Sequence, residues 1–465
     1  SISMRRAVRP LLAALACATA LASPAGAAEP SAAQHAETLV IWKKMVSIPT
    51  VLGRGQMPVM ANYVADLLRK GGFAAEDVIV EGTGDATTVA ARYRGTGKGK
   101  PILLSGHMDV VEARASDWTR DPFTPVEENG YLFGRGVLDM KFGNAVMVST
   151  LIKLKQEGFR PSRDIILLLS GDEETDMLTS QRLAKQYGVA ELLLNADGGG
   201  GLLDAQGKPV AFYVQGAEKT YADFEITITN PGGHSSRPHP DNAIYDLASA
   251  IDRIAAYQFP AQVSELTKAY WAATGKLVGG QLGAAMRAFA KNPEDKAALA
   301  TLRAQPEYVG VTGTTCVATM LSGGHALNAL PQKASVSVNC RIFPGVSIDS
   351  VKSKLTEIIA NPKANIITLG APVASDASPL RPDLMKALRK GVDLSFPGLP
   401  IIPQMASGAT DSLYFRGIGI PSYGVIGMFI KPEDDFSHGL NERAPIASID
   451  PALRLMRSLL IDLAK

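Results

Sequence analysis

Two histidines and three carboxylates stand where the chain could hold a metal ion. Each follows a short apolar run, as a residue at the end of a buried strand would. They are His107, Asp139, Glu174, Asp197 and His438. Imidazole nitrogens and carboxylate oxygens are the groups that zinc and similar ions bind in proteins. The sequence therefore favours a metal site assembled from the loop ends of one domain.

The five groups can be divided between two ions. Ions about 3.5 to 4 Å apart can share one bridging carboxylate, and we expect Asp139 to be that bridge. His107 and Asp197 would then complete one ion's ligands. Glu174 and His438 would complete those of the other. Two Zn²⁺ ions fit this nitrogen and oxygen set, and Co²⁺ or Mn²⁺ could also occupy it.

Two further carboxylates lie beside these ligands. Asp109 comes two residues after His107, on the same face of an extended segment, and can accept the second N–H of the imidazole. Glu173 is adjacent to a ligand but points elsewhere. We expect Glu173 to be the general base for a water molecule whose pKa the ions lower toward about 7.

Composition limits the partners. The 465 residues predict two domains, and 46% hydrophobic with 20% charged residues is typical of a globular protein. The net charge of +2, without a basic run that contains aromatic residues, argues against binding nucleic acid. The partner is expected to be a small molecule.

Residues 1–28 are typical of a secretory signal with a short lead. Arg5, Arg6 and Arg9 precede an apolar run over 11–22, and Ala25-x-Ala27 fits a cleavage site. A membrane anchor would need about 20 apolar residues, which disfavours that alternative. No later segment is long and apolar enough to span a bilayer. We expect a periplasmic or secreted protein.

The rest of the chain predicts two units. Helices alternate with continuously apolar strands over 29–213 and again over 346–465, which predicts an α/β domain with a mixed sheet covered by helices on both faces. In such sheets ligands gather at the C-terminal ends of the strands, where His107, Asp172 to Glu174 and Asp197 fall. Residues 214–345, with their half-exposed strands, predict a smaller inserted α+β unit.

The cysteines that remain after signal removal leave two interpretations open. Cys316 and Cys340 lie in two strand-like runs that antiparallel pairing could place opposite one another, and a secretory compartment would allow a disulfide. Buried as separate thiols, they would instead behave as small hydrophobic residues.

Six motifs together resemble one enzyme family, and they cover nearly all of the mature chain in the family's order. They are His107-x-Asp109, Gly134-Arg135-Gly136-x-x-Asp139-Met140-Lys141, Asp172-Glu173-Glu174, Asp197 followed by glycines, Gly233-His234-Ser235-Ser236 and His438-Gly439-x-Asn441-Glu442. The chain resembles metallopeptidase family 20, the co-catalytic zinc hydrolases that include aminoacylase, carboxypeptidase S, carnosinase and succinyl-diaminopimelate desuccinylase. The resemblance implies the same bridging aspartate, base and ligands, and an inserted lid or dimerisation domain.

The resemblance also implies substrate contacts. His234 would stabilise the developing oxyanion, often across a dimer interface, and Asn328 and Arg341 would contact the substrate. A guanidinium binds a carboxylate bidentately, so Arg341 suits a substrate that ends in a free carboxylate. Gly408 lies in Ser407–Asp411, which resembles the family's glycine-rich substrate loop, although Ser407 and Ala409 depart from its pattern.

These features predict a zinc-dependent exopeptidase of carboxypeptidase or dipeptidase type, which cleaves the amide bond of dipeptides or short peptides. An N-acyl-amino-acid amidohydrolase, similar to aminoacylase, is the alternative within the family. Asp197, where desuccinylase-like members carry glutamate, favours the carboxypeptidase S, carnosinase and aminoacylase branch without separating peptide from acyl substrates. A periplasmic binding protein without catalysis is the alternative from another class.

Overall fold

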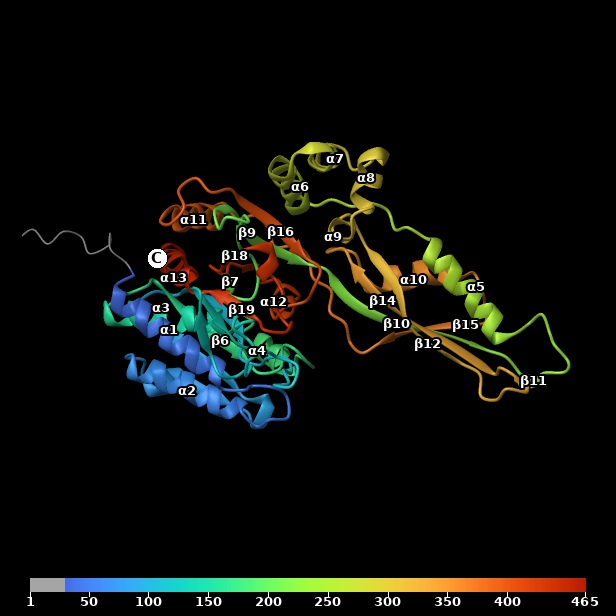
Figure 1. Ribbon diagram of the computed structural model, residues 1–465, viewed down its shortest axis with the longest axis horizontal. Coiled ribbons are helices and arrows are strands. Elements are labelled where there is room, and N and C mark those ends of the chain that lie inside the picture. The colour runs from blue at the N-terminus through green and yellow to red at the C-terminus, as the bar shows by residue number, and fades with distance from the viewer. Residues whose placement is uncertain (1–29) are drawn as a thin grey trace, which may run out of the picture.

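The computed structural model describes residues 30–465 and has two domains side by side (Figure 1). The large domain is built on a mixed sheet with the strand order β1-β2-β6-β3-β7-β17-β9-β8-β18, and β16 pairs with β9 off this path. These strands are β1 (Val78–Glu81), β2 (Thr88–Tyr93), β3 (Gly99–His107), β6 (Arg163–Ser170), β7 (Leu192–Asn195), β8 (Gly200–Leu203), β9 (Pro209–Glu218), β16 (Ile401–Ala406), β17 (Ser422–Gly424) and β18 (Phe429–Ile430).

Helices cover both faces of this sheet, as the sequence predicted. One face packs against α1 (Ala32–Ser47), α2 (Met57–Lys70), α3 (Lys141–Gln156), α11 (Pro382–Asp393) and α13 (Ile449–Leu463). The other packs against α4 (Leu178–Gln186) and α12 (Ser412–Arg416). In β6, Leu167 faces the first group of helices and Leu168 the second, so its continuous apolar run is buried on both sides.

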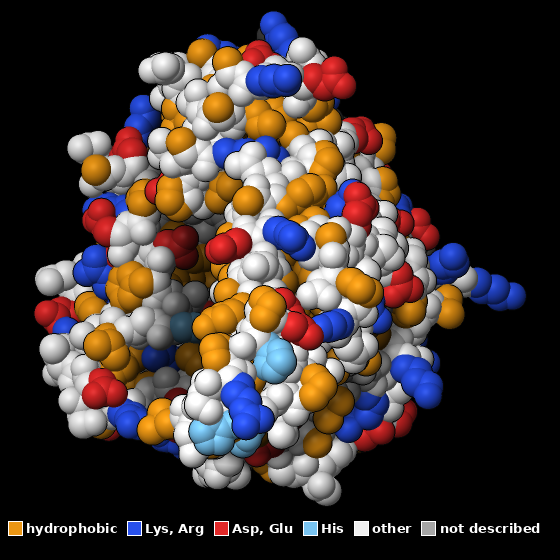
Figure 2. Space-filling model, turned by 90° about the vertical axis from the view of Figure 1, so that its right-hand side faces the viewer, with side chains coloured by type: hydrophobic (Ala, Val, Ile, Leu, Met, Phe, Trp, Pro, Cys, Tyr) orange, Lys and Arg blue, Asp and Glu red, His pale blue; other side chains and the backbone are white. Residues whose placement is uncertain are grey.

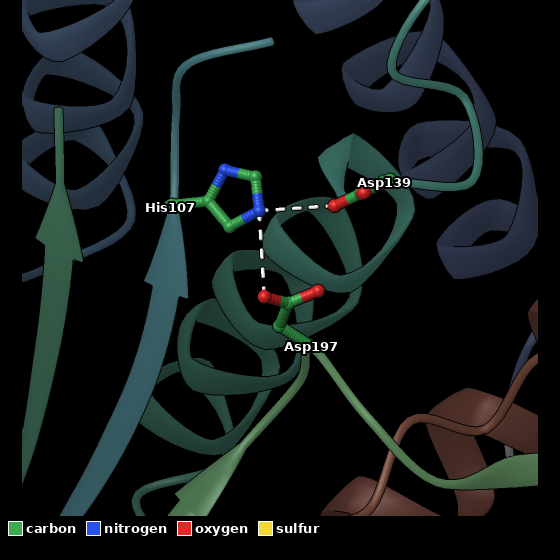
Figure 3. Close-up of side chains that lie close together, drawn as sticks. All are labelled: His107, Asp139 and Asp197. Carbon is green, nitrogen blue, oxygen red and sulfur yellow. Dashed lines mark hydrogen bonds and ion pairs between the residues drawn. The ribbon is translucent and has the colours of Figure 1, made fainter. Parts of the chain in front are cut away.

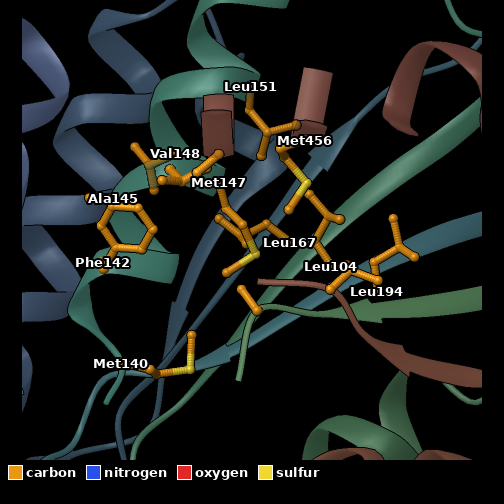
Figure 4. Close-up of a cluster of buried hydrophobic side chains, with 14 of the residues drawn as sticks. Leu104, Met140, Phe142, Ala145, Met147, Val148, Leu151, Leu167, Leu194 and Met456 are labelled. Atoms are coloured by element: carbon orange, nitrogen blue, oxygen red, sulfur yellow. The ribbon is translucent and has the colours of Figure 1, made fainter. Parts of the chain in front are cut away.

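The larger core lies directly under the site. Figure 4 shows Phe142, Met147 and Leu151 of α3 packed over Leu104 and Leu194 of the central strands. A short sheet of β4 (Val126–Glu128), β5 (Tyr131–Phe133) and β19 (Arg443–Pro445) lies apart from the main one. Because interiors pack as densely as crystals, the strand ends and the N-terminus of α3 are held in fixed positions.

The small domain is a four-stranded sheet in the order β12-β14-β10-β15, with helices on one face. Its elements are β10 (Thr220–Thr229), α5 (Ala243–Ala256), β12 (Thr315–Gly323), β14 (Lys333–Ile342), α10 (Ile348–Ile359) and β15 (Ala364–Leu369). In β10 the alternate residues Ala222, Phe224, Ile226 and Ile228 are buried against α5 and α10. This is the half-exposed strand that the alternating sequence predicted.

The small sheet begins and ends later than the expected limits of 214 and 345. β9 stays in the large sheet as far as Glu218, and the small sheet begins at Thr220. At the other end, β15 pairs with β10, so the small domain continues to Leu369. Alternation of helix and strand cannot show which sheet a strand joins, and here α10 and β15 complete the smaller one.

Two features project from the small domain. A helical cluster of α6 (Glu265–Val278), α7 (Gly280–Lys291), α8 (Lys296–Arg303) and α9 (Pro306–Val309) packs around Trp271, Met286 and Phe289, and α6 also contacts β16. A two-stranded antiparallel sheet of β11 (Gly233–His234) and β13 (Ala329–Leu330) forms the end of the domain farthest from the large one (Figure 1).

Cys316 and Cys340 form a disulfide bond between β12 and β14. They are directly opposite in the antiparallel register of these strands. Of the two interpretations that the sequence left open, the structure has the paired one.

The predicted signal, 1–28, lies outside the described residues. Among residues 30–465, no helix combines the length and the apolar character needed to cross a membrane.

Replacing both cysteines by alanine should lower the free energy of unfolding by about 3 kcal/mol, because the unfolded chain regains the entropy of a loop that spans a separation of 24 residues. Denaturant unfolding of the unreduced protein measures this difference. Reduction of the parent should reproduce much of the loss. Free Cys316 and Cys340 thiols in unreduced, denatured protein would contradict the prediction.

Candidate active site

His107 ends β3 and its side chain is almost fully buried. Its Nδ1 lies 2.9 Å from the backbone oxygen of Asp109 and 3.3 Å from that residue's carboxylate. A carbonyl oxygen can only accept, so Nδ1 carries the proton and Nε2 presents its lone pair to the site. Nε2 lies 3.0 Å from Asp139 and 3.4 Å from Asp197, which follows β7 (Figure 3).

Asp139 lies just before α3 and faces both histidines. Its Oδ1 is 3.0 Å from Nε2 of His107, and its Oδ2 is 2.9 Å from Nε2 of His438. One carboxylate thus presents a different oxygen to each imidazole. This is the arrangement expected of a carboxylate that bridges two ions.

The second group of candidate ligands comes from two more loops. Glu174 follows β6, and its Oε1 is 2.9 Å from Nε2 of His438. His438 precedes β19 and is about half exposed, whereas His107 is buried. Single donor atoms of His107, Asp139 and Asp197 lie within 4.8 Å of one another, as do those of Asp139, Glu174 and His438. The structure therefore brings all five predicted ligands together in these two overlapping sets, and a third set of the same kind joins His107, Glu173 and Glu174.

The Asp109 carboxylate has a role beyond the predicted contact with His107. It accepts the backbone N–H groups of Glu173 at 3.1 Å and of Glu174 at 2.9 Å. Asp109 thereby fixes the loop that carries both glutamates relative to His107. Glu173 Oε2 lies 3.5 Å from Nε2 of His107, so the predicted base faces the same space as the ligands.

The concentration of carboxylates changes the pKa values in the site. Burial raises the pKa of Glu173 well above its usual range, and the charge of Asp197 adds to this. Burial alone would lower the pKa of His107, but the surrounding carboxylates raise it well above the ordinary value. Hydrogen bonds to Asp139 and Glu174 raise the pKa of His438 to about 10. Such a cluster is stabilised by cations, either protons on the histidines or metal ions that displace them.

A buried ion pair joins the loops of Asp139 and His438. Arg135 Nη1 donates to Glu442 at 3.0 Å and to the Gly439 oxygen at 2.9 Å. The Glu442 carboxylate also accepts the backbone N–H of Leu138 at 2.7 Å and, at 3.3 Å, those of Gly136 and Asp139. Both residues occur in motifs read from the sequence, but their mutual contact did not follow from spacing.

The predicted substrate residues Arg341 and Gly408 lie close together. Arg341, on β14, donates to the Ser407 oxygen at 3.1 Å and stacks over Tyr221 at 4.6 Å. Gly408 is exposed in the next position of the loop between β16 and α12. The side chain of Arg341 thus joins the small domain to the loop that the sequence indicated.

A polar network that the sequence did not indicate connects this loop to a candidate ligand. Glu218 accepts the backbone N–H and hydroxyl of Thr410 at 2.9 and 2.8 Å. Asn195 donates to Ser412 at 2.9 Å and accepts the backbone N–H of Asp197 at 2.8 Å. The only sequence signal was the position of these polar residues at the ends of apolar strands.

His234 and Asn328 lie apart from the other candidates, at the small β11–β13 sheet at the far end of the small domain (Figure 1). They are neighbours, because the Ser235 N–H donates to the Asn328 oxygen at 3.0 Å. The Ser236 N–H donates to Nδ1 of His234 at 3.1 Å, so a neutral His234 carries its proton on Nε2. It can act as a donor, but the structure does not place it beside its own chain's ligands.

Replacing Glu442 by alanine should weaken metal binding about 10- to 100-fold, because outer groups that orient ligands affect affinity by this amount. It should also lower stability by about 3 to 5 kcal/mol, since Arg135 remains buried without its partner. Metal titration and denaturant unfolding measure the two effects.

Glu127→Ala is the matched control for Glu442→Ala, because Glu127 pairs with Lys43 at the surface, where such pairs contribute about 0 to 1 kcal/mol. Unchanged metal affinity in a folded Glu442→Ala protein would show that the ion pair does not position the ligands.

Comparison with curated proteins finds relatives across most of the chain. The human N-fatty-acyl-amino acid synthase/hydrolase PM20D1 is 27% identical over 376 residues, which are 78% of this chain and 74% of that protein. A probable succinyl-diaminopimelate desuccinylase of Staphylococcus aureus (strain Mu50 / ATCC 700699) is 30% identical over 365 residues, 77% of this chain and 82% of its own.

Solved structures share the fold. An M20 family metallo-carboxypeptidase, Sso-CP2 from Sulfolobus solfataricus, has a TM-score of 0.65 at 19% identity and covers 91% of this chain and 98% of its own. Human carnosine dipeptidase 1 has a TM-score of 0.61 at 15% identity, with coverage of 93% and 97%. The family model described as peptidase family M20/M25/M40 matches residues 103–462, and the chain therefore belongs to this family of metal-dependent hydrolases.

Proposed function

We propose that this protein is a two-metal hydrolase that cleaves the amide bond of dipeptides or short peptides with a free terminal carboxylate. The observation that carries the proposal is the Asp139 carboxylate, which presents one oxygen to each of two histidines. Around it, His107 and Asp197 would hold one ion, and Glu174 and His438 the other. All of these donors are nitrogen or oxygen, which suits Zn²⁺ and also admits Co²⁺ or Mn²⁺.

Two ions held there would polarise the amide carbonyl. They would also lower the pKa of a water molecule, so that it could lose a proton near neutral pH and attack that carbonyl. Glu173 would take the proton of that water and return it to the leaving amine. Its burial and its distance of 3.5 Å from His107 place it beside the ligands without a strong hydrogen bond to any of them. A carboxylate whose pKa is raised is suited to both halves of this transfer.

Arg341 would recognise the substrate's terminal carboxylate. Its guanidinium donates from Nη1 to the Ser407 oxygen and from Nε to Asn339, which leaves further N–H groups for a substrate, and Gly408 leaves the adjacent loop surface without a side chain. The Glu218 and Asn195 network would keep this loop in register with Asp197. The distance between Arg341 and the ions would then limit how far the terminal carboxylate of a substrate can lie from the amide bond that is cleaved.

N-acyl amino acids are the second candidate substrates. They share the amide bond and the free carboxylate with a dipeptide and differ only in the group on the acyl side. The similarity to an N-fatty-acyl-amino acid synthase/hydrolase supports this candidate, and the similarity to a carnosine dipeptidase supports the first.

Export to the periplasm or outside the cell is part of the proposal. The charge and apolar pattern of residues 1–28 supports it, and so does the Cys316–Cys340 disulfide, because disulfides persist in oxidising compartments.

A homodimer formed through the small domain would supply His234. β12 is an edge strand with exposed apolar side chains at Val317, Met320 and Leu321, the last two about 70% exposed. Figure 2 shows hydrophobic and histidine side chains together on this end of the molecule. An unpaired apolar edge is a template for pairing with a second chain. In the dimer, His234 of one chain would donate a hydrogen bond from its Nε2–H group to the oxyanion at the other chain's site.

Replacing Glu173 by glutamine should lower kcat by about 10²- to 10⁴-fold on both dipeptides and N-acyl amino acids, because the amide cannot accept the proton. Metal content should stay at the parent's value, since Glu173 is not a proposed ligand. Steady-state kinetics and metal analysis measure these effects, with the exposed Glu76→Gln as control. A parent loaded with zinc that binds both substrates and cleaves neither would instead support the binding-protein alternative.

Mixing Glu173→Gln with His234→Ala tests the shared site. If His234 acts in the partner's site, a mixed dimer has one intact site, and equal mixing should restore about a quarter of the parent's activity. If it acts in its own chain's site, mixing restores nothing. Sedimentation of the parent and of a Met320→Lys variant shows whether the edge of β12 forms the dimer.

A further inference from the structure

A cavity of about 480 Å³ opens beside two of the candidate metal ligands. Its volume lies within the range of roughly 300 to 1,000 Å³ that is typical of small-molecule sites. Its wall comes from β8, β9, β16 and β18 and from the segments around Asp139 and Asp197. Neither Arg341 nor the Ser407–Asp411 loop is part of this wall. The cavity would therefore contact a different part of the substrate from the terminal carboxylate that Arg341 is proposed to bind.

Burial shows which end of the cavity is deep. Gly200, Gly201 and Met428 are buried, whereas Pro432, Asp435 and Ser437 are exposed and mark the mouth. The deep part is therefore formed by backbone and apolar groups. The charged side chains near the mouth, Lys431 and Asp435, have opposite signs and give that rim no strong preference for an ionic group.

Aliphatic side chains line the middle of the cavity together with Tyr213 and Gln404, which are buried to the same degree. Leu202, Ile426 and Ile430 are only partly buried, and together with Met428 they present apolar surface to it. Ile430 pairs with Leu202 across the parallel strands β18 and β8, so the backbone holds these two in register. Filling this space with an apolar group would remove that surface from water, which is favourable in proportion to the area buried.

We propose that this cavity binds the acyl side of the substrate and selects an extended apolar group there. The proposal rests on the proposed function. The amide would lie at Asp139 and Asp197, the apolar chain would point toward Gly200 and Met428, and the carboxylate would face Arg341. The substrates that bind best are then N-acyl amino acids with medium-length aliphatic acyl chains, or dipeptides whose first residue is large and apolar.

The test is the affinity of zinc-loaded, full-length Glu173→Gln protein for N-acetyl-, N-hexanoyl- and N-decanoyl-leucine, measured by titration calorimetry. Because the Glu173→Gln substitution should block turnover, binding can be measured without hydrolysis of the ligand. Affinity should rise on the order of two- to four-fold per methylene group until the cavity is full. The parent is assayed in parallel for hydrolysis of the acetyl compound and of an unblocked dipeptide.

Substitutions at Ile430 test whether the acyl chain binds in this cavity. Ile430→Trp, introduced into Glu173→Gln, should remove most of the gain from acetyl to decanoyl and leave acetyl binding unchanged. Ile430→Ala should keep the gain or extend it, and it is informative even where the tryptophan variant does not fold. Ile418→Trp is the matched control, because Ile418 is 53% exposed in the same domain and does not line the cavity.

The outcomes separate the two proposals. Affinity that does not change with chain length, or a gain that Ile430→Trp and Ile418→Trp reduce equally, overturns the cavity proposal, whatever the parent hydrolyses. A gain that only Ile430→Trp removes supports it, even where the parent cleaves neither substrate and the proposed hydrolysis fails.

Discussion

The site depends on holding a single carboxylate between two imidazoles. Asp139 faces Nε2 of His107 with one oxygen and Nε2 of His438 with the other. Glu173, Glu174 and Asp197 lie around the same point, and their mutual repulsion opposes the arrangement in the absence of positive charge. Much of the surrounding structure therefore serves to keep negative groups close together, in an orientation that cations can stabilise.

Buried polar contacts provide that support. Asp109 binds the backbone of Glu173 and Glu174 while it faces His107, and Glu442 binds the backbone before Asp139 while it pairs with Arg135. Each of these carboxylates joins two loops that are far apart in sequence. Because such groups are costly to bury without partners, each contact favours one arrangement of the loops over others. The densely packed core beneath α3 gives these loops a rigid base.

In the proposed function, recognition of the substrate would be divided between the domains. Arg341 reaches from the small sheet to the Ser407 loop, the cavity beside Asp139 and Asp197 belongs to the large domain, and His234 lies at the far end of the small one. A substrate that spans the first two would be held at both of its ends. The proposed third contact requires a second chain, which would make the exposed edge of β12 part of the site's assembly as well as of the protein's surface.

The sequence by itself determined the alternating helices and apolar strands, the mixed sheet covered on both faces, and the position of His107, Glu174 and Asp197 at its strand ends. These follow from local periodicity and from the rule that ligands gather at strand ends, so they could be predicted without coordinates. Only the tertiary structure decided that β15 joins the small sheet, that Cys316 pairs with Cys340, that Glu442 meets Arg135, and that His234 lies away from its own chain's ligands. These features depend on which segments meet across long sequence separations, and spacing along the chain does not encode that choice.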